Sequence, residues 1–217
     1  MMFRVPENRL ESWTVPVFPL PDTVFFPGTS LPLHVFEPRY RELVRDVAEE
    51  DRLIVISLKT GDGFQALGTL GYIRDLEPLR GGRFNLRLAG LERVSLTEVP
   101  ADTPYRRARV VVRPERTGTI DASRISEARL ELLASYGMLR SMVRGNEPLI
   151  LNDNLPFDVI VNVACSALPL DATLLQGLLQ KDTLIDRQRL AQEYFSTAIE
   201  AMSWLRVMKP STSCLMN

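Results

Sequence analysis

The sequence predicts an α+β protein in which a β-rich lobe is followed by a helical bundle. Apolar and polar residues alternate with a period of two between Phe84 and Arg113, as in half-buried strands. After Thr119 the apolar residues recur every three or four positions, as on one face of a helix. The expected parts of the chain are an N-terminal arm at 1–14, a β-rich lobe at 15–118, a helical subdomain at 119–208 and a flexible tail at 209–217.

The stretch from Pro16 to Leu43 consists of short apolar runs separated by prolines. Since proline has no N–H to donate to a sheet ladder, each run is predicted to be a brief edge strand or an extended arm closed by a turn. After Glu37 the pattern changes, because Pro38 suits the first position of a helix and the next apolar residues recur at helical spacing. A helix is therefore predicted to begin at Pro38.

The next hundred residues contain the other expected strands. A continuous β-branched run at 52–58 predicts a strand buried on both faces, and Gly81-Gly82 predicts a hairpin turn. The segment from Thr60 to Phe64, with its two glycines, is expected to be a loop. The remaining predicted strands lie at 68–73 with a continuation to 79, at 84–88, at 94–96 and at 108–112.

Helix signals dominate the second half of the chain. A stripe from Ile125 to Val143 predicts a first helix, for which Asp121 or Ser123 is available as the N-cap. Three further helices are expected, and each has its own start signal. Pro156 opens one that runs to Leu168, Asp171 can cap the next, and Asp182 can cap a long one from about Leu184 to Met208. Gly145-Asn146 is expected to end the first helix.

A longer motif in the proline-rich stretch reads FPL, FPG and LPLHVFEPRY in order. It resembles the amino-terminal, substrate-binding domain of Lon-type ATP-dependent proteases. Two later runs, LPFDVIVNVACSAL and LLQGLLQKDTLIDRQRL, look like the helical part of the same domain. The resemblance implies a PUA-like pseudo-barrel for the β-rich lobe and the binding of unfolded or extended polypeptide.

The sequence lacks the motifs of the chemistry that Lon proteases perform. No Gly-Lys pair occurs, so no ATP-binding phosphate loop is present. His34 is the single histidine and has neither a second imidazole for a metal site nor a nucleophile arranged beside it. We expect no enzymatic activity, no cofactor and no metal. The resemblance then implies a standalone Lon-domain protein, an adaptor or modulator with an ATP-dependent protease as a candidate partner.

The motif residues Phe36, Glu37, Pro38, Arg39 and Tyr40 stand where the extended stretch meets the first helix. A carboxylate and a guanidinium can fix such a junction by hydrogen bonds, and the two aromatic residues are expected to be core anchors. This junction is therefore predicted to be structural, with ligand contact as the alternative. Polypeptide is expected to bind to the β-rich lobe, near the groove shared with the helices, by adding a strand to an exposed edge.

Arginines of the β-rich lobe suggest an alternative function. Strand pairing could join them into a basic stripe, formed by Arg83, Arg87, Arg107, Arg109 and Arg113. Since some RNA-binding proteins use PUA-like folds, the alternative is a sensor of RNA or of a small ligand. Aromatic stacking residues are not interleaved with these arginines, so a solvated strand face is favoured and nucleic acid is not the expected partner.

Composition and charge limit the classes of partner and the cellular compartment that we expect for this chain. A formal net charge of −1 gives no general attraction for nucleic acid or an anionic membrane. No apolar run approaches the ~18 residues that a membrane span needs, and the first residues carry no secretion signal. Cys165 and Cys214 lie far apart, which suits a reducing compartment. We expect a protein of the bacterial cytoplasm, and the sequence leaves its oligomeric state open.

Overall fold

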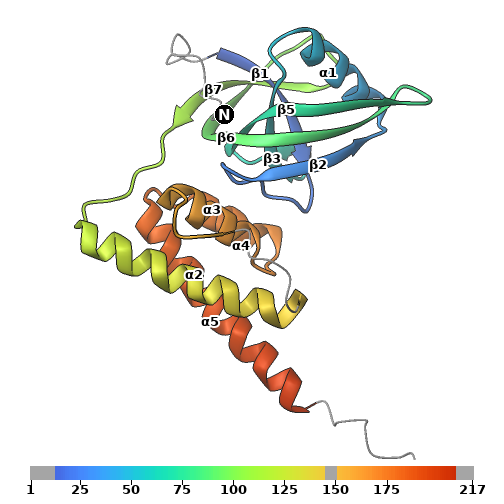
Figure 1. Ribbon diagram of the computed structural model, residues 1–217. Coiled ribbons are helices and arrows are strands. Elements are labelled where there is room, and N and C mark those ends of the chain that lie inside the picture. The colour runs from blue at the N-terminus through green and yellow to red at the C-terminus, as the bar shows by residue number, and fades with distance from the viewer. Residues whose placement is uncertain (1–12, 145–150, 209–217) are drawn as a thin grey trace, which may run out of the picture.

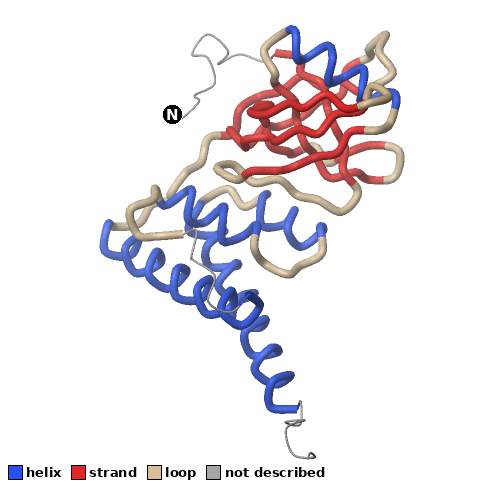
Figure 2. The backbone as a smooth tube through the Cα atoms, turned by 45° about the vertical axis from the view of Figure 1, so that its right-hand side comes forward, coloured by secondary structure: helices blue, strands red, loops and turns tan. Residues whose placement is uncertain are grey.

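Strands and one helix make up the first half of the described chain, and helices make up the second half (Figure 1). The computed structural model describes residues 13–144 and 151–208. The elements are β1 (Trp13–Leu20), β2 (Ser30–Val35), α1 (Pro38–Glu49), β3 (Leu53–Thr60), β4 (Gly63–Phe64), β5 (Leu67–Leu79), β6 (Arg83–Val99), β7 (Arg106–Arg113), α2 (Ala122–Arg144), α3 (Phe157–Ser166), α4 (Ala172–Leu179) and α5 (Leu184–Met208). The α+β class is confirmed, with the β-rich lobe stacked on the helical lobe (Figure 2).

Five strands close into a barrel in the order β1–β7–β6–β5–β3, because β3 also pairs with β1 in parallel. Apolar side chains such as Val17, Val55 and Leu70 fill its interior. β1 pairs with β7 through Trp13–Val17 and with β3 through Val17–Leu20. The prediction of an edge strand is therefore wrong for β1, and Trp13 and Thr14 belong to the barrel rather than to an arm.

β6 changes partner halfway along its length. Its residues Phe84–Ala89 pair with β2, whereas Arg93–Val99 pair with β7, and β5 pairs with it along the other side. The change occurs at Gly90, whose N–H donates to the Thr29 carbonyl. The sequence indicated two strands here, and the structure shows one. β2, the first half of β6 and the second half of β5 form a sheet that extends from the barrel. In the described chain, β2 pairs with no strand besides β6.

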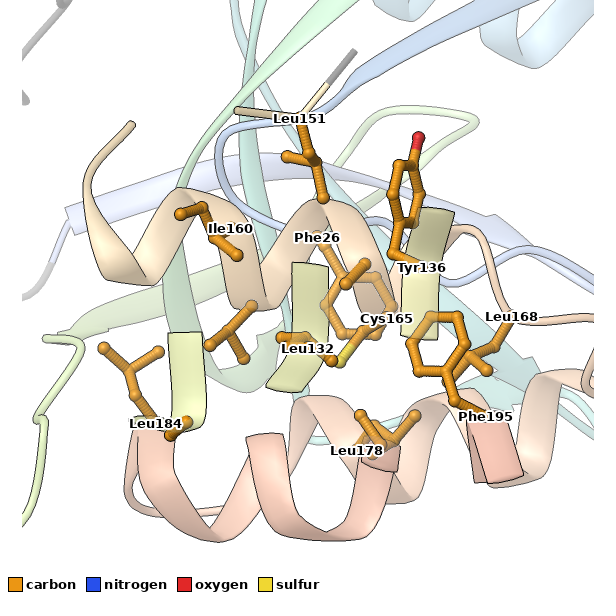
Figure 3. Packing of buried hydrophobic residues seen from close by; sticks show 14 of the residues in the cluster. Phe26, Leu132, Tyr136, Leu151, Ile160, Cys165, Leu168, Leu178, Leu184 and Phe195 are labelled. Carbon is orange, nitrogen blue, oxygen red and sulfur yellow. The ribbon is translucent and has the colours of Figure 1, made fainter. Parts of the chain in front are cut away.

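The loop between β1 and β2 joins the two lobes through neighbouring aromatic residues. Phe25 packs under α1 in the core of the β-rich lobe, while Phe26 is 0% exposed in the core of the helical lobe (Figure 3). The backbone between these side chains is held by the barrel, since the Thr69 hydroxyl donates to the Phe25 carbonyl over 2.5 Å. Each lobe is therefore packed against one side of the same short loop.

Side-chain caps fix the starts of three helices. Asp121 accepts from the Arg124 N–H over 2.8 Å at α2, and Asp171 accepts from the Thr173 N–H over 2.9 Å at α4, as predicted. At α5 the prediction of Asp182 is wrong, because the Thr183 hydroxyl accepts from the Asp186 N–H over 3.2 Å. No described helix is long and apolar enough to cross a membrane.

One other predicted feature differs in the structure. The segment at 60–64 is a tight β3–β4 hairpin rather than a loop, with Gly61 at φ 51°. Several expectations fall on residues outside the described ranges and stay untested by the structure. These are the arm at 1–12, the helix end at Gly145-Asn146, and the tail at 209–217 with Cys214.

Candidate functional site

The outer face of the β2–β6–β5 sheet carries an ordered set of exposed side chains. On β2, residues 30, 32 and 34 are exposed, whereas Val35 packs inward. Cross-strand pairing places His34 opposite Asn85 and Asn85 opposite Glu77. The same register places Pro32 opposite Arg87 and Arg87 opposite Asp75. Two rows of side chains therefore cross the sheet, one beside the other.

The row that begins at His34 is connected by hydrogen bonds. The Asn85 amide nitrogen donates to Glu77 Oε2 over 3.0 Å. Its amide oxygen is thus left to accept, and His34 Nδ1 lies 2.8 Å from it and acts as the donor. His34 Nε2 has no hydrogen-bond partner among the described residues, so it can contact a guest molecule. In the second row, Arg87 Nε lies 3.5 Å from Asp75 Oδ2.

A groove of about 620 Å³ runs over these rows. Its lining combines apolar and polar residues from the three strands, and it consists of Pro32, Leu33, His34, Asp75, Leu76, Glu77, Asn85, Leu86 and Arg87. The lining holds two carboxylates and one guanidinium, so the groove has a net negative charge. The Phe36 ring stands beside the groove, with its centroid 6.1 Å from that of His34.

Phe36 corrects the prediction that it is a core anchor, because its side chain is 61% exposed. The reason is the two-residue period of β2. Residues 30, 32 and 34 point outward, and Phe36 continues the same phase immediately beyond the end of the strand. Because Pro32 and His34 belong to this outward phase, the sequence pattern could have placed Phe36 on the surface. The aromatic side chain is therefore available for contact.

The other residues of the junction make contacts within the chain. Tyr40 is buried and stacks on Phe18 with ring centroids 3.9 Å apart. Arg39 Nη2 pairs with Glu37 Oε2 over 2.9 Å, and its guanidinium carbon lies 4.5 Å from the Tyr40 ring centroid. Pro38 is the first residue of α1, as predicted. These contacts fix the start of α1 directly after the strand that carries His34.

Tyr105 links the segment before β7 to the C-terminal part of α1. Its hydroxyl donates to Asp46 Oδ2 over 2.6 Å. Burial, this hydrogen bond and the Asp46 charge raise the pKa of Tyr105 to about 12. An unfolded tyrosine titrates near pH ~10. The neutral phenol therefore stabilises the native state below that pH, and this contribution is lost as the pH rises from about 10 to about 12.

We accordingly expect the wild-type protein to lose stability more steeply than Tyr105→Phe between pH 10 and about 12. Urea unfolding at a series of pH values measures the two slopes. The other four tyrosines remain in both proteins, so the comparison isolates the contribution of residue 105. Equal slopes for the two proteins would contradict the assignment of this hydrogen bond.

The arginines of the alternative basic surface fall into two groups. Arg83 and Arg87 lie on the half of β6 that pairs with β2, whereas β7 pairs only with Arg93–Val99 of that strand. Arg107, Arg109 and Arg113 lie along β7 on the barrel. Strand pairing therefore does not join the five residues into one stripe.

The structure offers few groups for covalent or metal chemistry within its described ranges. No group of three or more His, Cys, Asp or Glu residues in those ranges could hold a metal ion. Cys165 is buried in the helical core, and burial raises the pKa of its thiol to about 12. This thiol therefore stays protonated and is a poor nucleophile.

A closed barrel with a sheet extension, followed by four helices, defines an α+β domain with a PUA-like pseudo-barrel. The family model of the ATP-dependent protease La (LON) substrate-binding domain matches residues 14–196. The chain therefore belongs to this family. Its fold is also that of two solved Lon domains.

One solved relative is the N-terminal domain of the Mycobacterium avium complex Lon protease. It has a TM-score of 0.65 and 19% identity, with 85% of this chain and 98% of that chain covered. The other is a Lon N-terminal domain protein from Xanthomonas campestris, with a TM-score of 0.62 and 25% identity over 82% of this chain and 95% of that one.

Longer relatives match over their Lon domain only. Lon protease 1 of Herpetosiphon aurantiacus is 24% identical over 82% of this chain and 22% of its own length. Lon protease 2 of Sorangium cellulosum is 30% identical over 67% of this chain and 18% of its own length. The chain therefore spans about a fifth of the length of these relatives.

Proposed function

We propose that this chain binds unfolded or extended polypeptide on the outer face of the β2–β6–β5 sheet. The observation that carries the proposal is the exposed Phe36 ring beside a groove of about 620 Å³, in a member of a substrate-binding family. An exposed aromatic residue next to hydrogen-bonding side chains is typical of a protein contact site. The net acidic groove favours polypeptide over RNA as its occupant.

Binding combines an apolar anchor with backbone recognition. An apolar side chain of the guest covers Phe36, and the guest backbone contacts His34 and Asn85 in the groove. The free edge of β2 can also pair with a guest strand, but Pro32 lacks an N–H and weakens that pairing. Side chains therefore contribute more than edge pairing, which gives broad specificity.

The affinity of one such site is weak. Burying a few apolar side chains contributes ~1.5–3 kcal/mol each, and ordering the peptide offsets much of this gain. Dissociation constants in the micromolar range or above are the result. Selective binding of a polypeptide then requires several sites to bind it at once, or a partner protein that also binds it.

The same proposal includes a role as a non-enzymatic adaptor or modulator of an ATP-dependent protease in the cytoplasm. It is supported by the family match, which concerns a substrate-binding domain, and by the location of the candidate surface on the β-rich lobe. Assays of ATP and casein hydrolysis test the absence of enzymatic activity. The absence of activity would be contradicted if the purified protein hydrolysed either substrate and a point substitution in this chain abolished that hydrolysis.

Hydrogen exchange tests where polypeptide binds. The full chain is measured alone and with a reduced, unfolded model protein. We expect added protection at Ser30–Val35 and Phe84–Leu88. β1 should show no added protection, because both of its sides are already paired. Protection confined to the helical lobe would contradict the proposed surface.

Replacing Phe36 by alanine should separate binding from stability. We expect the affinity for the unfolded model protein to fall at least ~fivefold, as for an interface anchor. The free energy of unfolding should change by less than ~0.5 kcal/mol, because the side chain is on the surface. Leu130→Ala on α2 is the matched control, since Leu130 is 63% exposed and far from the sheet in sequence.

Two outcomes would contradict the role of Phe36. One is an affinity that falls equally in both variants, and the other is binding that weakens steeply with salt. Steep salt dependence indicates phosphate or charge-driven recognition and would favour the RNA-binding alternative.

A further inference from the structure

A second cavity, of about 440 Å³, lies where β6 and β7 meet the turn between α4 and α5. It is separate from the groove over β2 and shares none of its lining residues. Three arginines line it, namely Arg93 of β6, Arg113 of β7 and Arg116 after β7. Asp182 and Thr183 contribute from the helical lobe. The cavity is therefore lined by both lobes.

Arg93 lines this cavity and is held in place by hydrogen bonds. Its side chain is 5% exposed, and Nη1 donates to the Leu179 and Lys181 carbonyls over 2.9 and 2.8 Å. Its Nε faces Glu115 Oε1 at 3.4 Å. Its other terminal nitrogen, Nη2, donates to no acceptor among the described residues. A positioned guanidinium with an unused donor is a feature of a built oxyanion site.

The other two arginines also keep donors available. Arg113 Nε donates to Ser95 Oγ over 2.6 Å, which orients its side chain and leaves both terminal nitrogens without an acceptor in the described chain. The Arg116 side chain is exposed and likewise has no hydrogen bond or ion pair within the described ranges. Donors of three guanidiniums thus border a single cavity.

The charge balance of the lining is positive. Asp182 is the one carboxylate against three guanidiniums among the lining residues. Glu115 faces Arg93 at 3.4 Å and pairs with Arg187 at 2.7 Å, and it does not line the cavity. Glu92 lies near both Glu115 and Asp158, but neither Glu92 nor Asp158 lines the cavity.

We propose that this cavity binds the phosphate group of a small molecule or free inorganic phosphate. Guanidiniums match the charge of a phosphate and donate to its oxygens, and here Arg113 and Arg116 offer parallel donors while Arg93 offers Nη2. The volume exceeds that of one phosphate, so a phosphate monoester fits as well as the free ion. Because the lining comes from both lobes, the ligand binds the native state and raises the unfolding temperature.

The test is a titration of the full chain with inorganic phosphate at constant ionic strength, followed by 15N-detected NMR of backbone amides and arginine Nε–H groups. Ribose 5-phosphate forms a second arm, which distinguishes a monoester from the free ion, and sodium chloride forms the third. We expect the NMR chemical shifts of Arg93, Arg113 and Thr183 to change in a saturable way with at least one of the two phosphate ligands. Sodium chloride should cause no such change.

Three variants make the test specific. Arg116→Gln should weaken phosphate binding at least tenfold, whereas Asp182→Asn should strengthen it several-fold by removing the one lining carboxylate. Arg109→Gln, an exposed β7 arginine outside the cavity, should leave it unchanged. Shifts that do not saturate, equal weakening by Arg109→Gln, or no effect of Asp182→Asn would each overturn the proposal.

Discussion

Replacing Phe26 by alanine is expected to lower the free energy of unfolding by about 3–5 kcal/mol, the usual cost of truncating a buried phenylalanine. The ring fills the core of the helical lobe among Leu132, Ile160 and Phe195 (Figure 3). Its backbone, however, is bound to the β-rich lobe, because the flanking residues Gly28 and Thr29 bond to Gly90 of β6. The substitution therefore removes a contact that couples two cores, as well as apolar burial.

The two tryptophans allow this coupling to be measured. Trp13 lies in the barrel and Trp204 lies on α5, so each lobe has its own fluorophore. Urea unfolding is followed by tryptophan fluorescence in two backgrounds. In Trp13→Phe the signal of Trp204 reports the helical lobe, and in Trp204→Phe the signal of Trp13 reports the barrel. The coupling would be established if the two lobes unfold at the same urea concentration when Phe26 is present and at different concentrations in Phe26→Ala. A change below ~1 kcal/mol in both lobes would contradict it.

Gly90→Ala tests the same junction from the other side. A Cβ at Gly90 would overlap the Phe26 carbonyl oxygen, so the backbone of one strand or of the loop must move. Gly177→Ala is the matched control, because no heavy atom lies within 4 Å of its added Cβ and it sits inside α4. We expect Gly90→Ala to destabilise the protein and Gly177→Ala to stabilise it by ~0.5–1 kcal/mol.

Features that depend on neighbouring residues could be predicted from the sequence. The start of α1 at Pro38 follows from the fixed φ of proline, and the cap of α4 at Asp171 follows from its side-chain oxygen. The hairpin at Gly81-Gly82 is also local, since both glycines adopt positive φ values of 76° and 70°. The family motif was recognisable for a similar reason, because it is one continuous run.

Features that depend on distant residues could not be predicted in the same way. The parallel pairing of β1 with β3 closes the barrel, but nothing within β1 specifies that partner. The adjacent Phe25 and Phe26 look alike in sequence and enter different cores. The rows on the outer sheet face exist only once the register of β2 and β6 is set, so the candidate groove could not be found from sequence.

Asp182 and Thr183 show how a local signal can be misread. Both are good capping residues, and they are adjacent. Thr183 caps α5, and its carbonyl also accepts from the Arg187 N–H over 3.1 Å. Asp182 is left exposed at the cavity between the lobes. Its role therefore depends on the docking of the lobes, which the sequence does not show.

The segment after β7 joins the lobes through a second buried contact. The Glu115 side chain is 10% exposed, and its Oε1 lies 2.7 Å from Arg187 Nη1 and 3.4 Å from Arg93 Nε. Arg187 is 0% exposed and also donates to the Leu178 carbonyl over 3.0 Å. Together the two arginines bind carbonyls at the C-terminal end of α4, where positive charge is stabilising.

Glu115→Gln is expected to lower the free energy of unfolding by about 3–5 kcal/mol, because it leaves two buried guanidiniums without a paired carboxylate. The glutamine keeps the shape of the side chain, so the loss reports the missing charge rather than a cavity. Glu127→Gln is the matched control, since Glu127 pairs with Arg124 on the surface and should cost no more than ~1 kcal/mol.

Urea unfolding of both variants at low and high salt distinguishes the two pairs. Salt should reduce the small effect of Glu127→Gln and leave that of Glu115→Gln nearly unchanged, because a buried pair is screened far less than an exposed one. If Glu115→Gln cost no more than Glu127→Gln, the buried ion pair would not be what holds the helical lobe to the barrel. The coupling would then depend on Phe26 and the apolar contacts around it.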